Sequence, residues 1–266
     1  MSSLRESKLA FIGGGNMASA IIGGLLNQGI TAQNIITTTS NVNAGGDADM
    51  VIIAVKPQVT KSVCEELGAA WSQRTTLPVV VSIAAGITLE SLKQWLQTSD
   101  SRTAHIVRVM PNTPALVGEG ASGLFASSDV TADEKALVNA LLQSVSKATE
   151  WVDKEELLDV VTGLSGSGPA YFFAMVEHLV ASATALGLPI EQATRLASQT
   201  CLGAGKMLAE SSDSPAQLRK NVTSPNGTTY AALQTFESLD FSGVVDKAVQ
   251  AATSRAAELG NTLGKL

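Results

Sequence analysis

Short apolar stretches alternate with amphipathic ones through the first half of the chain, and this alternation constrains the fold more than any other feature. Continuous apolar or β-branched runs occupy residues 8–13, 50–55, 78–83 and 105–110. Such runs are typical of strands buried on both faces of a parallel sheet. Segments between them, such as residues 18–28 and 89–97, have the apolar spacing of helices. The pattern predicts a doubly wound α/β domain over residues 1–152.

A glycine-rich turn links the first predicted strand to the first predicted helix. Residues 13–18 read Gly-Gly-Gly-Asn-Met-Ala and fit the pattern G-x-G-x-x-A. In this context Gly13 makes the tight turn, Gly15 lets a pyrophosphate approach the backbone, and Ala18 packs the helix on the strand. A purely structural turn is the alternative. We interpret the segment as the NAD(P)-binding turn of a Rossmann-type domain.

The second half of the chain changes character near residue 152, where strand-like runs stop. Phe172, Met175 and Leu179 recur at helical spacing, and a further helix is expected over residues 190–209. This pattern predicts an all-helical domain over residues 153–266. Apolar residues on more than one helical face, as in residues 181–185, indicate a surface covered by a second copy.

Composition excludes several classes of function. The net charge is −6, from 18 Lys and Arg against 24 Asp and Glu, and basic residues do not cluster. This balance argues against nucleic acid and anionic membranes as partners. Cys64 and Cys201 lack metal-ligand spacing, so we expect reduced thiols and no metal site. No apolar run reaches the roughly 18 residues of a membrane span, and we expect a cytoplasmic protein.

A hydroxyl-rich turn precedes a predicted helix that begins near Tyr230. Residues 221–229 contain four hydroxyls and an Asn-Gly pair. The first turn of a helix leaves backbone N–H groups unpaired at the positive end of the helix dipole. The amides of Thr228 and Thr229, with nearby hydroxyls, can therefore hold an anion such as a carboxylate. An ordinary turn and N-cap is the alternative.

This stretch is also the most specific of several that carry a family resemblance. Residues 218–237, LRKNVTSPNGTTYAALQTFE, resemble the signature of pyrroline-5-carboxylate reductases, the enzymes that make proline. Matching blocks follow the family order at residues 11–17, 54–58, 107–114 and 163–171. The resemblance implies NAD(P)H-dependent reduction of the C=N bond of 1-pyrroline-5-carboxylate to L-proline. It also implies a helical domain that forms a homodimer, which in this family is often assembled into a ring of dimers.

The resemblance assigns roles residue by residue. It implies that the substrate carboxylate binds the Thr228 and Thr229 amides, with a hydrogen bond from the Ser224 hydroxyl. It also implies that the Thr229 hydroxyl donates a hydrogen bond or a proton to the ring nitrogen during catalysis. Glu155 and Gly227 are also expected to contact substrate. The expected cofactor-binding residues are Ile12, Gly13, Gly14, Gly15, Asn16, Met17, Asn41, Ala54, Val55, Lys56, Pro57, Ile83, Ala84, Ala85 and Asn221.

One segment is shorter than the fold requires. A βαβ unit takes roughly 30 residues. Ile35 lies in the second predicted strand and Met50 in the next recognisable one, and too few residues lie between them for a helix and a further strand. About twenty residues are missing around residues 37–40, judged from ordinary element lengths. Either the segment is deleted or a stretch is unrecorded, and we favour the second because a deletion should expose apolar surface. The lost piece normally contacts the adenosine ribose, so NAD and NADP cannot be distinguished by sequence here, although we favour NADPH.

Two other functions fit parts of the pattern. β-Hydroxyacid dehydrogenases join a similar nucleotide domain to a helical one, but their glycine-rich segment is followed by a catalytic lysine. Residues 169–173 supply no lysine, and His105 and His178 lie in apolar stretches typical of packing histidines. A protein that binds NAD(P) without turnover is the other alternative, and only an assay would exclude it.

Overall fold

The chain forms two compact units. The computed structural model describes residues 4–38 and 46–263. One unit comprises Met1–Ser167 together with Gln250–Leu266, and the other comprises Gly168–Val249. The last strand ends at Trp151, close to the domain boundary predicted at residue 152, which stays a prediction.

A seven-stranded sheet in the order β2-β1-β3-β4-β5-β6-β7 forms the centre of the first unit. β1 to β5 are mutually parallel, β6 is antiparallel to β5, and β7 is parallel to β6. The strands are β1 (Leu9–Ile12), β2 (Ile35–Thr38), β3 (Met50–Ile53), β4 (Val79–Ser82), β5 (Ile106–Met110), β6 (Gly120–Ala126) and β7 (Ser146–Trp151). The four strands predicted from continuous apolar runs are confirmed as β1, β3, β4 and β5.

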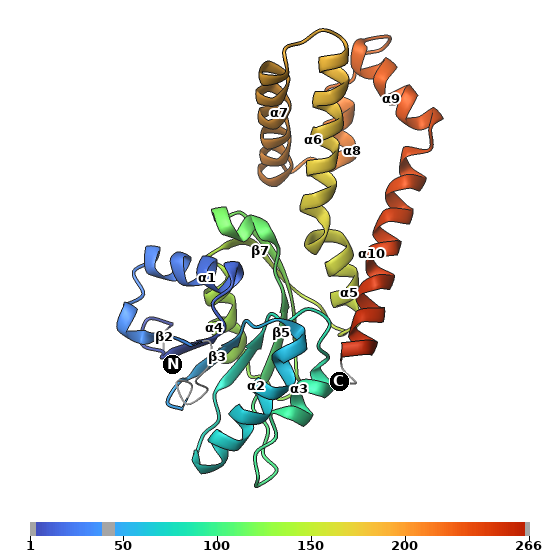
Figure 1. Cartoon of the computed structure of the whole chain (residues 1–266). Helices are drawn as coiled ribbons and strands as arrows, with labels where there is room; N and C mark the ends of the chain where they lie inside the picture. Colours follow the sequence, from blue (N-terminus) through green and yellow to red (C-terminus); the bar gives the residue numbers. More distant parts are fainter. Residues whose placement is uncertain (1–3, 39–45, 264–266) are drawn as a thin grey trace. The chain divides into compact units, whose positions relative to one another are not determined.

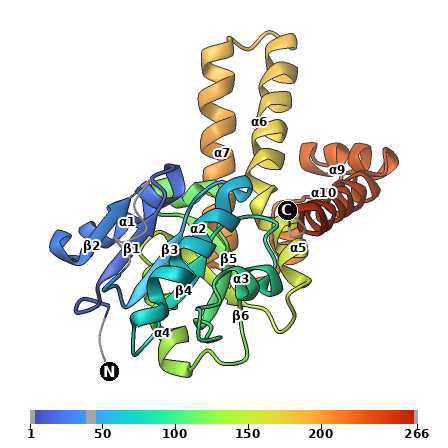
Figure 2. The ribbon, with the colours of Figure 1, turned by 60° about the horizontal axis from the view of Figure 1, so that its bottom comes forward.

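Helices cover both faces of this sheet (Figures 1 and 2). α1 (Asn16–Asn27) and α4 (Ala132–Leu142) bury apolar side chains on one face, in a core that includes Phe11 and Ile52. α2 (Pro57–Ala70) and α3 (Leu89–Trp95) pack on the other face with Ile53. Successive strand residues point to opposite faces, so strands between two helical layers must be apolar throughout. The doubly wound architecture is therefore confirmed.

β2 forms one edge of the sheet. It ends at Thr38, and β3 begins at Met50, so the intervening chain is too short for a crossover helix and another strand. In the Rossmann order 3-2-1-4-5-6 a further strand lies outside this position. The described residues contain no such strand, and Ile36 on β2 is 41% exposed. This exposed isoleucine is the apolar surface that we expect where a crossover is missing.

The second unit is entirely helical, as predicted. It contains α6 (Gly168–Ala185), α7 (Ile190–Glu210), α8 (Pro215–Asn221), α9 (Thr228–Ser238) and the start of α10 (Phe241–Leu263). α6 and α7 lie side by side, connected by a turn in which Gly187 has φ +101° (Figure 2). The first unit holds α5 (Leu157–Val161), a π-helical turn over Thr162–Gly166, and the rest of α10.

No helix in the described ranges 4–38 and 46–263 combines the length and apolar character that a membrane span requires.

Candidate active site

The glycine turn between β1 and α1 has a conformation that requires glycine at its first position. Gly13 has φ +109°, and a Cβ there would overlap the carbonyl group of Ala54, with the carbonyl carbon only 2.7 Å away. The Gly13 N–H donates to the carbonyl oxygen of Thr38 at 2.8 Å. Only glycine combines this positive φ with so close an approach to β3. The predicted role of Gly13 in the tight turn thus has a direct steric cause.

The first turn of α1 is open toward the space that a phosphate group would need. Gly15 is the N-cap, with φ −71° and ψ 176°, and no side chain caps the helix. A Cβ built on Gly15 would meet no atom within 4 Å. Asn16 begins the helix, and Ala18 is buried against the sheet. Unpaired N–H groups beside open space fit the pyrophosphate of a dinucleotide.

The other predicted cofactor residues of the first unit lie along the same edge of the sheet. Ile12 is in register with Ile53, and Ile53 with Ser82, so β1, β3 and β4 end side by side. Residues 54–57 and 83–85 follow the last two of these strands. This edge contains the point where the strand order reverses between β1 and β3, which is where ligands bind in open α/β sheets.

Two predicted cofactor residues lie elsewhere. Asn41 falls outside the described residues. Asn221 ends α8 in the second unit, where its Oδ1 accepts from Gln217 Nε2 at 2.6 Å and its Nδ2 donates to Asp213 at 3.1 Å. Its contact with cofactor stays a prediction.

The hydroxyl-rich turn in the second unit leads directly into α9. The Gly227 N–H donates to the Ser224 carbonyl at 3.0 Å, and Asn226 adopts φ +59°. α9 begins at Thr228, two residues before the predicted start, and no side chain caps it. Thr229 is half-buried, whereas Ser224 and Thr228 are exposed. The first-turn amides and the exposed hydroxyls of Ser224 and Thr228 are therefore available to an anion. This is the geometry that a carboxylate needs.

Glu155 has partners that the sequence did not indicate. Its Oε1 accepts from Arg108 Nη1 at 2.5 Å and from the Leu89 N–H at 2.6 Å. Nearby, burial raises the pKa of Asp159 above its ordinary value; Arg108 opposes this rise, and Glu155 adds to it. Sequence reasoning missed Arg108, because its partner lies 47 positions away. The predicted contact of Glu155 with substrate stays a prediction.

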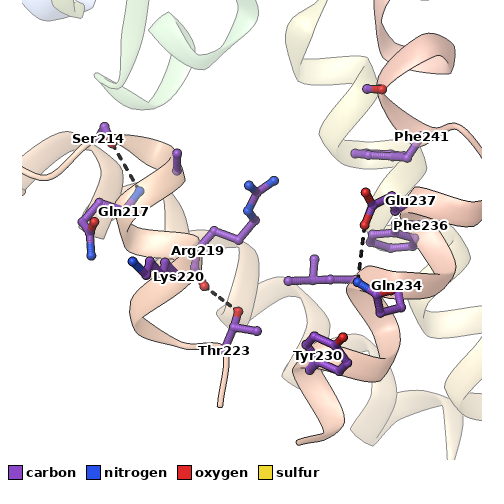
Figure 3. A pocket seen from close by; sticks show the side chains of 13 residues that line it. Ser214, Gln217, Arg219, Lys220, Thr223, Tyr230, Gln234, Phe236, Glu237 and Phe241 are labelled. Carbon is purple, nitrogen blue, oxygen red and sulfur yellow. Dashed lines mark hydrogen bonds between the residues drawn. The ribbon is translucent and has the colours of Figure 1, made fainter. Parts of the chain in front are cut away.

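An open hollow of about 900 Å³ lies between α8, α9 and the start of α10. Figure 3 shows Arg219 extending from α8 into this hollow, with Tyr230 and Gln234 on the α9 side. The rings of Phe236 and Phe241 stack at its margin, 5.0 Å apart. Aromatic side chains around so wide an opening are typical of a surface that a partner covers.

Comparison with known proteins decides the family. A family model for pyrroline-5-carboxylate reductase dimerisation matches residues 155–259. The pyrroline-5-carboxylate reductase of Pseudomonas aeruginosa is 43% identical over 277 positions, covering 97% of this chain and 98% of the relative. The chain belongs to the pyrroline-5-carboxylate reductase family. The Arabidopsis thaliana member is 39% identical over 96% of both chains.

Solved pyrroline-5-carboxylate reductases have the same fold. The Coxiella burnetii structure gives a TM-score of 0.88 at 40% identity, covering 95% of this chain and 98% of that one. The Plasmodium falciparum structure, solved with NADP bound, gives 0.82 at 30% identity, covering 96% and 99%. The predicted family, fold and pyridine-nucleotide-dependent reductase activity are therefore confirmed.

The comparisons also bear on the short segment after β2. A family model described as NADP oxidoreductase, coenzyme F420-dependent, matches residues 8–45 and 33–86 as two overlapping pieces. The Pseudomonas alignment spans 277 positions, more than the 266 residues of this chain. This relative thus contains residues that the present chain lacks. The two family-model matches overlap over residues 33–45, the region in which the sequence predicts a missing crossover.

Proposed function

We propose that this chain reduces 1-pyrroline-5-carboxylate to L-proline with NADPH, and that the first turn of α9 holds the substrate carboxylate. One observation carries the assignment of the substrate site. The Asn226-Gly227 turn delivers the chain into α9 without a side-chain cap, so the Thr228 and Thr229 amides keep their donors for a ligand. This turn lies within the segment that matches the reductase family.

In this proposal the cofactor lies along the carboxyl edge of the sheet in the first unit. Gly13 and Gly15 allow the backbone to approach the pyrophosphate, and the first-turn N–H groups of α1 donate to it. Residues 54–57 and 83–85 line the nicotinamide half. When bound, the reduced nicotinamide supplies the hydride. The preference for NADPH over NADH draws support from the Plasmodium relative, which was solved with NADP.

The substrate residues have separate tasks in the proposed reaction. The Thr228 and Thr229 amides hold the carboxylate, and the Ser224 hydroxyl adds a hydrogen bond. The Thr229 hydroxyl donates to the ring nitrogen, which gains electron density as its neighbouring carbon is reduced. A threonine hydroxyl is a weak acid, so it either orients the nitrogen or passes a proton from water. The alternative is an imine that is already protonated in solution.

A direct assay tests this proposal. Purified protein with NADPH should show oxidation of the cofactor on addition of 1-pyrroline-5-carboxylate, with L-proline identified by mass spectrometry. A higher kcat/KM with NADPH than with NADH is expected. Binding of NADPH without turnover would instead indicate a nucleotide-sensing protein, and turnover of a β-hydroxyacid would indicate the dehydrogenase alternative.

The proposed unit of assembly is a homodimer formed through the second unit. Large apolar side chains on its helices are exposed, including Phe173 at 69%, Leu196 at 61% and Val244 at 60%. The family model that covers these helices is one for dimerisation. Size-exclusion chromatography with light scattering at micromolar concentration should give a dimer or a multiple of it, and a ring of dimers stays an expectation. A monodisperse monomer would refute the proposal.

We further propose a cytoplasmic location, which cell fractionation would test.

A further inference from the structure

An ion pair between Arg108 and Glu155 joins β5 to the segment just before α5. Arg108 lies on β5 beside Ser82 of β4, in register with it. Its side chain is 11% exposed and contacts Glu155, 28% exposed, at 2.5 Å. Charge-assisted hydrogen bonds of this kind are short and geometrically specific. The pair therefore fixes the Glu155 carboxylate at one point next to the end of β4.

The fixed carboxylate also holds the start of α3. Its Oε1 accepts the N–H of Leu89 at 2.6 Å, and Leu89 is the first residue of that helix. This N–H has no partner inside its own helix, and the Thr88 side chain caps Ser91 instead. Arg108, Glu155 and Leu89 thus form a continuous hydrogen-bonded link from β5 to α3.

The link ends on the loop that contains predicted cofactor residues. Residues 83–88 connect β4 to α3 and include Ile83, Ala84 and Ala85. The loop starts at Ile83, whose N–H donates to Ile53 at 3.1 Å. At its middle, Gly86 has φ +74°, and a Cβ there would come within 3.4 Å of the Gly260 nitrogen on α10. The beginning of the loop is thus tied to Ile53 by a hydrogen bond, the middle lies close to α10, and the end is held by Glu155.

We propose that Arg108 and Glu155 are positioning residues, which together set the 83–88 loop for the nicotinamide half of the cofactor. The inference rests on the proposed function of that loop. Three carboxylates, from Glu155, Glu156 and Asp159, line a cavity of about 330 Å³ beside this loop. Among the described residues that line the cavity, Arg108 is the one that carries a positive charge. Without Arg108, Glu155 faces two like charges and turns toward water, releasing the Leu89 N–H.

Arg108→Met and a matched control test the link in the cofactor-free protein. Arg255→Met is the control, because Arg255 also pairs with a glutamate but is 66% exposed. Hydrogen exchange of the Leu89 amide should become at least about tenfold faster in Arg108→Met, since local opening sets this rate. The control should exchange at the wild-type rate. If Arg108→Met does not fold, Arg108→Lys, which keeps the charge, should show a smaller rise in the same amide.

The kinetic readout separates positioning from general damage. Arg108→Met should lower kcat by roughly 10- to 100-fold, because small displacements of a reacting group cost that much. Its KM for 1-pyrroline-5-carboxylate should stay within about threefold, a change of less than about 1 kcal/mol. The effects of Arg108→Met and Glu155→Gln should not add in the double variant, because the residues act as one unit.

Two results would overturn the inference. One is wild-type exchange of Leu89 in Arg108→Met, and the other is faster exchange with an unchanged kcat. If Glu155 instead contacts substrate directly, Glu155→Gln should raise KM while Leu89 stays protected, and positioning would be wrong. Absence of turnover in the wild-type protein would refute the proposed function, while the exchange measurement would still report on the link.

Discussion

Alanine at Gly13 and at Gly15 should damage two different properties of the protein. At Gly13 a Cβ overlaps the Ala54 carbonyl and φ is +109°, so alanine strains both the backbone and its packing. A non-glycine residue in such a region costs about 1–3 kcal/mol, and an overpacked site costs about 1–3 kcal/mol more. We expect Gly13→Ala to lower the free energy of unfolding by roughly 2–6 kcal/mol on this reasoning.

At Gly15 the backbone is extended and the space around a Cβ is empty. Gly15→Ala should therefore change stability by less than about 1 kcal/mol, the scale of an N-cap effect. The added methyl occupies the approach of the pyrophosphate, so the Kd for NADPH should rise by about tenfold or more, equivalent to about 1.4 kcal/mol of lost binding.

Thermal unfolding and NADPH titration of both variants check the pair. Gly13→Ala should lower Tm by roughly 4–24 °C, given about 2–4 °C per kcal/mol in chains of this size. Gly15→Ala should keep the wild-type Tm and bind NADPH weakly. If Gly15→Ala bound NADPH with the wild-type Kd, the pyrophosphate could not lie against this turn. A wild-type Tm for Gly13→Ala would refute the steric argument.

Three further predictions concern single side chains. Thr229→Ala should reduce kcat/KM by roughly 10- to 1,000-fold, the range from a lost hydrogen bond to a lost proton donor. Thr229→Ser should keep most of the activity. A wild-type rate in the alanine variant would favour imine protonation in solution. Burial raises the pKa of Asp159, so its ionised form opposes folding. Asp159→Asn should therefore stabilise the protein at neutral pH, by up to about 1 kcal/mol, and urea titration should show this gain disappearing below the ordinary pKa of Asp. Burial alone would raise the pKa of Glu134, but hydrogen bonds from Thr131 and His105 outweigh it and hold this pKa below its ordinary value. Thr131 and Glu134 form a capping box at the start of α4. The stability that it contributes should be present above the ordinary pKa of Glu and be lost as the pH falls through the lowered pKa of Glu134. Thr131→Ala should therefore cost about 1 kcal/mol at neutral pH and less in acid, as measured by urea unfolding.

The sequence predicted β1, β3, β4 and β5 well because each of these buried strands is a largely apolar run of consecutive residues. β3 reads Met-Val-Ile-Ile and is fully buried. β6 reads Gly-Ala-Ser-Gly-Leu-Phe-Ala and β7 Ser-Lys-Ala-Thr-Glu-Trp, and neither has a continuous apolar run. β6 is antiparallel to β5, and β7 lies at the sheet edge with several exposed side chains. Strand pairing, rather than local composition, forms these two strands, and a single sequence does not report pairing.

The same distinction applies to the candidate site. The Gly13–Gly15 turn was predictable because the strand, the turn and the helix are adjacent in the sequence. The link from Arg108 to Glu155 was not, since it joins residues 47 positions apart and depends on how β5 faces the first helical segment. The sequence offered one weak signal for it: Arg108 is a charged residue inside an otherwise apolar strand, and buried charges need partners.

Helix starts at the two predicted ligand sites share a feature that separates them from several other helix starts in this chain. The side chains of Thr88, Thr131 and Ser214 cap α3, α4 and α8, each accepting an N–H of its own helix. Gly15 and Gly227 occupy the same position at α1 and α9 and supply no acceptor. Glycine at an N-cap costs only a few tenths of a kcal/mol relative to serine or threonine, yet it leaves a first-turn donor free. A glycine N-cap after a tight turn therefore indicates an anion site more strongly than a helix start alone, and here one such site faces the predicted pyrophosphate and the other the predicted carboxylate.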